Sequence, residues 1–150
     1  MIEEYGDLWA DFWEKGDHVA ITTNGTIDRS GCVVTGAGCA QEATERFPAF
    51  PAKLGKLVRN GGNLPFYFEE WRLVTFPVKH QWWYLAEIDL IKLSMILLHE
   101  IVMQHDIKRI AIPRPGCGNG GLNWERIVRP ALVPLVADNP QFVFITRKPR

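Results

Sequence analysis

Apolar and polar positions follow two different periods along the chain, and the switches between these periods mark the expected elements. Residues 18–23 are rich in β-branched side chains and predict a strand, as do residues 107–112 and 141–146. Over residues 88–102 apolar side chains recur every three or four positions, which predicts a long, deeply packed helix. Shorter strands are expected at residues 1–5, 64–68 and 72–76, and helices at 36–47, at 53–58 and from residue 124 onward.

Strand-like and helix-like segments therefore alternate, which predicts an α/β fold with helices on both faces of a sheet. With 150 residues, of which 47% are hydrophobic and 23% charged, the chain is expected to form one domain over residues 1–150. Ligands of such folds bind beyond the C-terminal ends of the strands.

Composition and charge exclude several classes of function. The formal net charge is zero, so no global field draws the chain to nucleic acid or to an anionic membrane. Three cysteines form no Cys-x-x-Cys pair, and no cysteine–histidine set has zinc spacing, so neither disulfides nor a bound metal are expected. The longest apolar tract, residues 85–102, is interrupted by charges, and no signal peptide is recognisable. We expect a cytoplasmic monomer that needs neither a membrane nor a cofactor.

The most informative segment is a glycine-rich run, Pro113-Arg114-Pro115-Gly116-Cys117-Gly118-Asn119-Gly120-Gly121-Leu122, between an expected strand and an expected helix. Glycines let the backbone approach a ligand and adopt positive φ, and a helix N-terminus offers unpaired N–H groups. Together these features predict a site for phosphate or diphosphate. The run also fits Gly-x-Gly-x-x-Gly, but only one strand follows and no acidic residue ends it, which argues against dinucleotide binding. A tight connection without a ligand is the remaining alternative.

A second glycine segment, Gly36-Ala37-Gly38, opens the helix expected at residues 36–47. It is a second candidate for contact with phosphate, although close packing of the helix on the sheet would also require small residues. Two helix N-termini could hold a diphosphate between them without any lysine or arginine.

Four further positions carry candidate chemistry. Asn24 ends a strand and could bind a sugar hydroxyl, or it could simply form an Asn-Gly turn. Lys79 follows another strand and is either a positioned amine or an ordinary solvated charge. Trp82 and Trp83 could stack on a base or a sugar, or could pack at a helix start. Cys117 could be a thiolate nucleophile, but no histidine lies near it in sequence, which favours a small loop residue.

With these residues in view, the chain resembles a macro domain, the ADP-ribose-binding α/β/α module, and is most similar to the branch of compact ADP-ribosyl glycohydrolases. That branch includes antitoxins that remove ADP-ribose from DNA. The similar segments keep the order of the family: Gly6-Asp7-Leu8, Ile21-Thr22-Thr23-Asn24-Gly25, Thr35-Gly36-Ala37-Gly38-Cys39-Ala40, Phe76-Pro77-Val78-Lys79-His80-Gln81-Trp82 and Gly116-Cys117-Gly118-Asn119-Gly120-Gly121-Leu122-Asn123-Trp124.

The resemblance implies a three-layer α/β/α fold with a mixed central sheet. It implies that Asp7 binds the adenine amine, that Asn24 lies beside the distal ribose, and that Lys79 and Asn24 are the catalytic residues. The full set of ADP-ribose-binding residues that it implies is Asp7, Leu8, Asn24, Thr35, Gly36, Ala37, Gly38, Gly116, Cys117, Gly118, Asn119, Gly120, Gly121 and Leu122.

One departure from the family bears on the substrate. Some members that clear ADP-ribose from protein carboxylates use a lysine together with an aspartate in the second loop, and Gly120 takes the place of that aspartate here. The form of the loop is instead similar to members that act on thymine bases in DNA. The resemblance therefore implies an ADP-ribosyl glycohydrolase with ADP-ribosylated DNA favoured over protein. The alternatives are a non-catalytic ADP-ribose reader and an ADP-ribose 1″-phosphate phosphatase.

Overall fold

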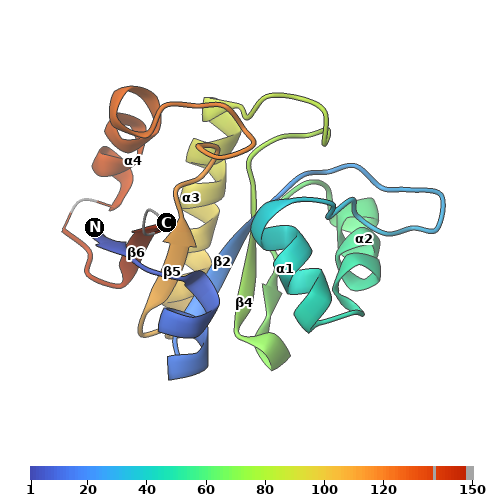
Figure 1. Cartoon of the computed structure of the whole chain (residues 1–150), viewed down its shortest axis with the longest axis horizontal. Coiled ribbons are helices and arrows are strands. Elements are labelled where there is room, and N and C mark those ends of the chain that lie inside the picture. The colour runs from blue at the N-terminus through green and yellow to red at the C-terminus, as the bar shows by residue number, and fades with distance from the viewer. Residues whose placement is uncertain (137, 148–150) are drawn as a thin grey trace.

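The computed structural model describes residues 1–136 and 138–147, and a six-stranded sheet runs through its centre (Figure 1). Its strand order is β1-β6-β5-β2-β4-β3. Strand β3 runs antiparallel to β4, and the other neighbouring strands are parallel, so the sheet is mixed as expected. The strands are β1 (Ile2–Tyr5), β2 (His18–Thr23), β3 (Tyr67–Phe68), β4 (Leu73–Pro77), β5 (Ile110–Pro113) and β6 (Phe142–Thr146).

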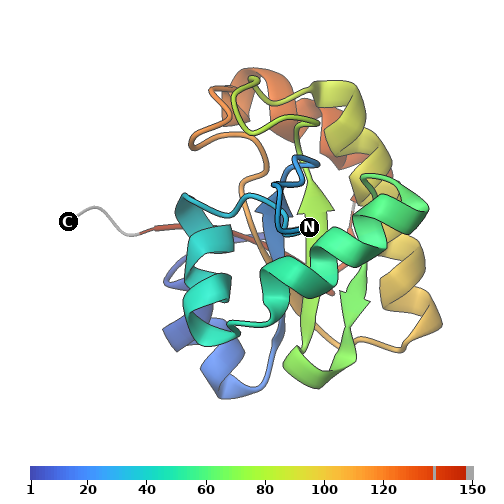
Figure 2. The ribbon, with the colours of Figure 1, turned by 90° about the vertical axis from the view of Figure 1, so that its right-hand side faces the viewer.

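Helices cover both faces of this sheet and make the three layers. On one face, α1 (Gly38–Arg46) and α2 (Phe50–Gly61) pack together with the π-helical turn η1 (Leu8–Phe12). On the other, α3 (Ile88–Gln104) packs beside η4 (Trp124–Val128) and α4 (Arg129–Val136). Figure 1 shows α1 and α2 on one side of the strands and α4 on the other, and Figure 2 looks onto the α2 side. The short 3-10 helices are Trp13–Lys15 and Glu69–Trp71.

Alternating side chains of the central strands supply both halves of the core. In β2, Val19 and Ile21 pack with α1 and α2, whereas Ala20 packs with α3, and all three are fully buried. In β6, Phe144 and Val143 divide between the two faces in the same way. Burial on both faces requires apolar residues at consecutive positions, which explains the continuous apolar runs of these strands.

The helix bounds differ from the predictions where proline and glycine are involved. Helix α2 begins at Phe50, earlier than predicted, because Pro51 lies in the first turn, where its missing N–H costs no hydrogen bond. Helix α1 begins at Gly38 rather than at residue 36. The final helix, expected to be kinked or split by its prolines, passes from a π-helical turn to an α-helix at Arg129, and Pro134 lies inside α4.

Two further differences concern the strands and the first helical turn. The strand expected over residues 107–112 begins only at Ile110, and the one expected over residues 64–68 shortens to Tyr67–Phe68. The turn η1 was not predicted, since five residues are too few to show a helical period. Within the described part of the chain, no helix combines the length and the apolar character needed to cross a bilayer.

Candidate functional site

A cavity of about 1200 Å³ opens where the parallel strands end. Its walls include Thr22, Thr23 and Asn24 from the end of β2, Val78 and Lys79 after β4, Pro113 and Arg114 from β5, and Ile145 and Thr146 from β6. Because these strands are parallel, their C-terminal ends meet at one edge of the sheet, where ligands of α/β folds bind. The volume exceeds the roughly 300–1,000 Å³ of common small-molecule sites, so the cavity has room for an extended ligand.

The first glycine loop brings an uncapped helix N-terminus to this cavity. Ala37 is the N-cap of α1, and its methyl side chain cannot accept a hydrogen bond from the N–H groups of the first turn. Gly38 has a φ of 61°, a backbone conformation that side chains with a Cβ resist. The hydroxyl of Thr44 donates to Thr35 Oγ1 over 2.8 Å and ties the loop to the helix. Gly36, Ala37 and Gly38 all line the cavity, so the positive end of the helix dipole is available to an anion there.

The second glycine loop folds back on itself and leaves donors free. Leu122 N donates to Gly116 O over 2.9 Å, and Gly121 N donates to Gly118 O over 3.2 Å. Gly116 and Gly121 have φ values of 74° and 78°, which glycine adopts without strain. Among the described residues, the backbone N–H groups of Gly118, Asn119 and Gly120 find no acceptor. These three amides are suited to an anionic ligand.

The helix start after this loop corrects one expectation from the sequence. Asn123 caps the helix itself, because its Oδ1 accepts from Arg126 N over 2.8 Å. Trp124 is buried, and its Nε1 donates to Glu3 Oε1 over 3.0 Å. Asn123 therefore satisfies one donor of this helix N-terminus, which is not left fully open to a ligand.

The two loops face each other across the cavity. A Cβ built on Gly38 would lie 3.7 Å from Asn119 Nδ2, whereas a Cβ on Gly36 or Gly118 would meet nothing within 4 Å. Gly120 differs, since its Cβ would lie 2.6 Å from Gly116 O and 2.7 Å from the Cβ of Ala86. No side chain, an aspartate included, fits at Gly120 without movement of the loop.

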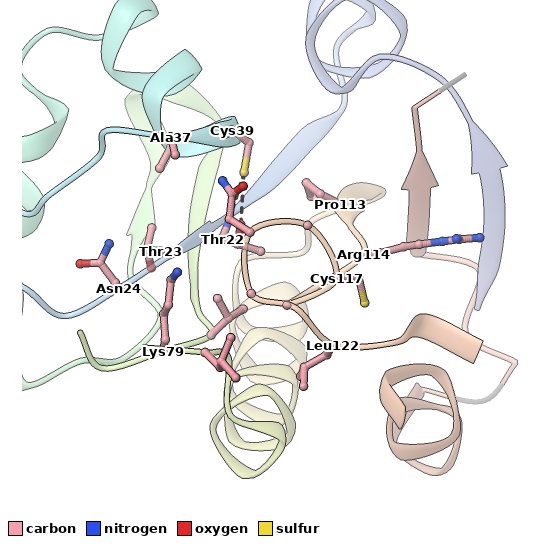
Figure 3. A pocket seen from close by; sticks show the side chains of 18 of the residues that line it. Thr22, Thr23, Asn24, Ala37, Cys39, Lys79, Pro113, Arg114, Cys117 and Leu122 are labelled. Atoms are coloured by element: carbon pink, nitrogen blue, oxygen red, sulfur yellow. Dashed lines mark hydrogen bonds between the residues drawn. The ribbon is translucent and has the colours of Figure 1, made fainter. Parts of the chain in front are cut away.

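Lys79 reaches the cavity from the segment after β4. Its amine extends toward Thr23 (Figure 3), and no hydrogen bond or ion pair to its Nζ occurs within the described part of the chain. Its backbone is fixed, because Asn63 Nδ2 donates to Lys79 O over 3.2 Å and Ser94 Oγ donates to Pro77 O over 2.7 Å. The side chain is half-buried. Lys79 thus presents its amine to the cavity from a segment whose backbone is held by hydrogen bonds at Pro77 and Lys79.

Asn24 is engaged in the turn that follows β2. Its Nδ2 donates to Val34 O over 3.0 Å, and its Oδ1 accepts from Thr26 N over 2.9 Å. These two bonds hold the loop after β2 in place. An amide still retains one N–H and one lone pair after these two bonds, and Asn24 lines the cavity, so contact with a ribose hydroxyl is compatible with the turn.

Both cysteines that line the cavity are held in the thiol form. Burial raises the pKa of the Cys117 thiol to about 11, and its Sγ donates to Pro115 O over 3.3 Å. Burial also raises the pKa of Cys39, whose Sγ accepts from Thr22 N. A thiolate nucleophile at Cys117 is therefore disfavoured. No cluster of three or more histidine, cysteine, aspartate or glutamate side chains suited to a metal ion occurs among residues 1–136 and 138–147.

Most of the residues expected at the site line this one cavity. Asp7 and Gly121 do not. The Oδ1 of Asp7 accepts from Trp9 N and Ala10 N over 2.9 and 2.8 Å, so this carboxylate caps η1. The expected residues that line the cavity are Leu8, Asn24, Thr35, Gly36, Ala37, Gly38, Lys79, Gly116, Cys117, Gly118, Asn119, Gly120 and Leu122.

Sequence reasoning missed lining residues that adjoin the predicted ones. Arg114, whose guanidinium lies 5.2 Å from the Trp124 ring centroid, and Thr146 at the end of β6 both line the cavity. Their position at the C-terminal ends of expected parallel strands was the available signal. Tyr84 and Leu85 also line it, and four consecutive large apolar residues outside any periodic segment were the signal for these.

Comparison with known proteins finds curated relatives that match part of this chain. No model of a protein family matches it. A curated protein of Mycobacterium tuberculosis, named DNA ADP-ribosyl glycohydrolase, is 28% identical over a match that covers 75% of this chain and 35% of that protein. The chain thus spans about a third of the length of the curated relative.

Solved structures agree over almost the whole chain. The macrodomain of Mycobacterium tuberculosis DarG superposes with a TM-score of 0.76 at 24% identity, covering 99% of both chains. Thermosipho africanus DarTG, solved in complex with ADP-ribose, superposes with a TM-score of 0.75 at 22% identity, covering 97% of this chain and 41% of that one. At these identities the likeness establishes the fold alone. The mixed sheet with helices on both faces, together with these superpositions, establishes that the chain has the macro domain fold.

Proposed function

We propose that the cavity binds ADP-ribose, with the diphosphate between the two glycine loops. The observation that carries this proposal is the convergence of free backbone donors, from the start of α1 and from Gly118, Asn119 and Gly120, on one cavity. Backbone N–H groups at such positions bind phosphate without a lysine or arginine. The relative from Thermosipho africanus, which shares the fold, was solved with ADP-ribose. Since one copy of the chain supplies all these donors, we propose that the monomer binds the ligand.

The proposed reaction is hydrolysis of the bond between ADP-ribose and the group it modifies. Lys79 is the residue to which we assign this step, because its amine reaches the cavity and has no hydrogen-bond or ion-pair partner among residues 1–136 and 138–147. Water adds to the anomeric carbon of the distal ribose, the glycosidic bond breaks, and the leaving group takes a proton. In this route the lysine stabilises the leaving group as the bond breaks. In a second route the neutral amine attacks the anomeric carbon and displaces the leaving group, which takes the proton that the amine loses, and water then hydrolyses the bond between the lysine and the ribose. In the second route the protein transiently gains the mass of one ADP-ribosyl group, which intact-mass spectrometry detects.

We further propose that the group released is a nucleobase of DNA. A curated relative is named DNA ADP-ribosyl glycohydrolase. The crowding around Gly120 also argues against an acidic partner for Lys79 in this loop, which a lysine–aspartate mechanism on protein carboxylates would need. The alternatives are a reader that binds ADP-ribose without turnover and a phosphatase acting on ADP-ribose 1″-phosphate.

A release assay read by mass spectrometry tests these proposals together. It compares a thymidine-modified oligonucleotide, a glutamate-modified protein and ADP-ribose 1″-phosphate, each with the native protein and with Lys79→Ala. We expect release from the oligonucleotide, a loss of about 10²–10⁴-fold in rate for Lys79→Ala, and nearly unchanged affinity for ADP-ribose in calorimetry. Release from the protein alone would overturn the DNA assignment. Binding without release from any substrate would identify a reader, and full activity of Lys79→Ala would remove the lysine from the mechanism.

A further inference from the structure

An exposed aromatic surface lies at the mouth of the cavity. Trp82, Trp83 and Tyr84, here called the aromatic rim, are 54%, 59% and 47% exposed, and Leu85 beside them is 72% exposed. All four line the cavity and lie in the connection from β4 to α3, a few residues after Lys79. A contiguous group of exposed large apolar side chains commonly marks a binding surface, whereas single exposed apolar residues are normal.

The rim is held in place on the protein by hydrogen bonds. Trp82 N donates to Thr26 Oγ1 over 2.9 Å, and Thr26 Oγ1 donates to Gln81 Oε1 over 2.8 Å. Tyr84 N donates to Gln81 O over 3.0 Å. At its far end, Ala86 N donates to Gly120 O over 3.0 Å. The backbone of the rim is therefore attached both to the loop after Asn24 and to the second glycine loop, so the rim stays beside the mouth of the cavity.

The packing of the rings leaves aromatic faces open. Trp82 and Trp83 meet with centroids 5.8 Å apart and planes at 83°, and Trp83 and Tyr84 meet at 5.6 Å and 79°. In an edge-to-face pair the edge of one ring covers one face of the other, so these two contacts cover at most two of the six faces. Open faces of this kind stack on planar groups, and unpaired nucleobases are such groups.

We propose that the aromatic rim binds unpaired bases that flank the modified nucleotide, and so makes a single strand a better substrate than a lone modified nucleoside. This inference rests on the function proposed above. It commits to a nucleic acid strand because the rim is contiguous with the cavity that holds the modified nucleotide. Residues 81–86 also include no charged side chain, so nothing in the rim repels a phosphate backbone. Stacking on rings of this kind tolerates any base sequence.

The absence of cations in the rim has a consequence for salt dependence. Proteins that follow phosphates with lysine and arginine lose affinity steeply as salt rises, because binding releases counterions. Binding through stacked rings should change far less between 50 and 200 mM salt. The salt dependence of strand binding therefore distinguishes stacking on the rim from binding of phosphates by cationic side chains.

The first experiment measures binding alone, and it is independent of catalysis. An unmodified, fluorescently labelled single strand is titrated with the native protein, with Trp83→Ala, with Tyr84→Ala and with Met103→Ala. Met103 is a matched control, since it is 59% exposed but lies in the last turn of α3, away from the start of the helix near the rim. Each rim variant should weaken binding by about 5-fold or more, as expected for one lost base–ring stack, while Met103→Ala binds normally. A duplex of the same sequence should bind more weakly.

The second experiment compares turnover of an ADP-ribosylated oligonucleotide with turnover of ADP-ribosyl-thymidine. The native protein should show a kcat/KM at least about 5-fold higher on the oligonucleotide, and this advantage should fall in Trp83→Ala and Tyr84→Ala. Equal losses on both substrates, or normal strand binding by both variants, would overturn the proposal. A rim effect confined to ADP-ribosylated protein would assign the surface to a protein partner instead. If the native protein releases ADP-ribose from neither, the proposed function fails, while the binding titration still decides whether the rim binds a strand.

Discussion

The prediction that tests the glycine loops most directly places a carboxylate at Gly118. A side chain at this position has open space ahead of it, since a built Cβ meets nothing within 4 Å and the φ of Gly118 is not positive. Gly38 and Gly120 are poorer probes, because Gly38 has a φ of 61° and a Cβ on Gly120 would crowd the backbone of Gly116. Gly118→Glu therefore adds charge to the cavity while leaving the loop in place.

The size of the effect follows from the distance between the new charge and the diphosphate. Two unit charges 4 Å apart repel by about 4 kcal/mol at an effective dielectric constant near 20 and by about 1 kcal/mol in water. The cavity is open to solvent on one side, so this range of about 1–4 kcal/mol predicts a rise of roughly 5- to 1,000-fold in the Kd for ADP-ribose. Gly118→Gln has the same length without the charge and separates repulsion from bulk. Gly118→Ala should bind within about threefold, and its unfolding free energy should stay the same or rise by about 0.4–1 kcal/mol.

Calorimetric titration with ADP-ribose measures the three affinities, and a cooperative thermal transition without ligand, at or above the native Tm, confirms that each variant is folded. Raising the salt should recover part of the affinity of Gly118→Glu but not alter that of Gly118→Gln, because only repulsion is screened. If folded Gly118→Glu binds ADP-ribose as tightly as the native protein, the second glycine loop does not hold the diphosphate.

Three further predictions concern residues outside the glycine loops. Asn63→Ala should lower kcat with little change in ADP-ribose affinity, because Asn63 holds the backbone carbonyl of Lys79, and an unchanged kcat would show that this hydrogen bond does not position the lysine. Cys117 should react slowly with iodoacetamide at pH 8, where a pKa of about 11 leaves roughly 0.1% thiolate, and rapid alkylation would contradict this burial. His18 has a pKa lowered by burial first and by Arg72 second. The unfolded chain therefore binds more protons in acid, so urea unfolding should show a loss of stability as pH falls below about 6.5 that His18→Gln lacks.

The fold was largely predictable because both faces of the sheet are covered. Strands buried on both faces, such as β2 and β6, give uninterrupted apolar runs, and α3 gives a clear helical period. The predicted ends of elements were wrong where a local interaction, and not the spacing of apolar residues, decides where the element begins. Asp7 caps η1, which is too short for a periodic signal, and the first turn of α2 accommodates Pro51.

The parts of the site that contain glycines were predictable. The parts where a side chain accepts a hydrogen bond from a backbone N–H group were less so. The two loops were recognisable because Gly38, Gly116 and Gly121 adopt positive φ, a need that favours glycine in the sequence itself. The cap that Asn123 places on the helix start at Trp124 was not anticipated, although an asparagine before a helix is a recognised cap signal. Arg114 and Thr146 could be read as candidates from their places at the ends of expected strands, but that they line the same cavity depends on the order of the strands, which a single sequence does not specify.

The charges of the cavity and the zero net charge of the chain are consistent with one mode of recognition. Glu42 and Glu125 line the cavity, but Glu42 is paired with Arg147 over 2.9 Å, so its charge is largely compensated. Binding a diphosphate through backbone amides needs no surplus of cations, and stacking bases on an uncharged rim needs none either. In the proposed reaction Lys79 is not needed for the phosphates, so its amine is available to the bond that breaks. A chain without net charge can therefore act on an anionic polymer, provided that it recognises the shape of the modified nucleotide rather than the charge of the strand.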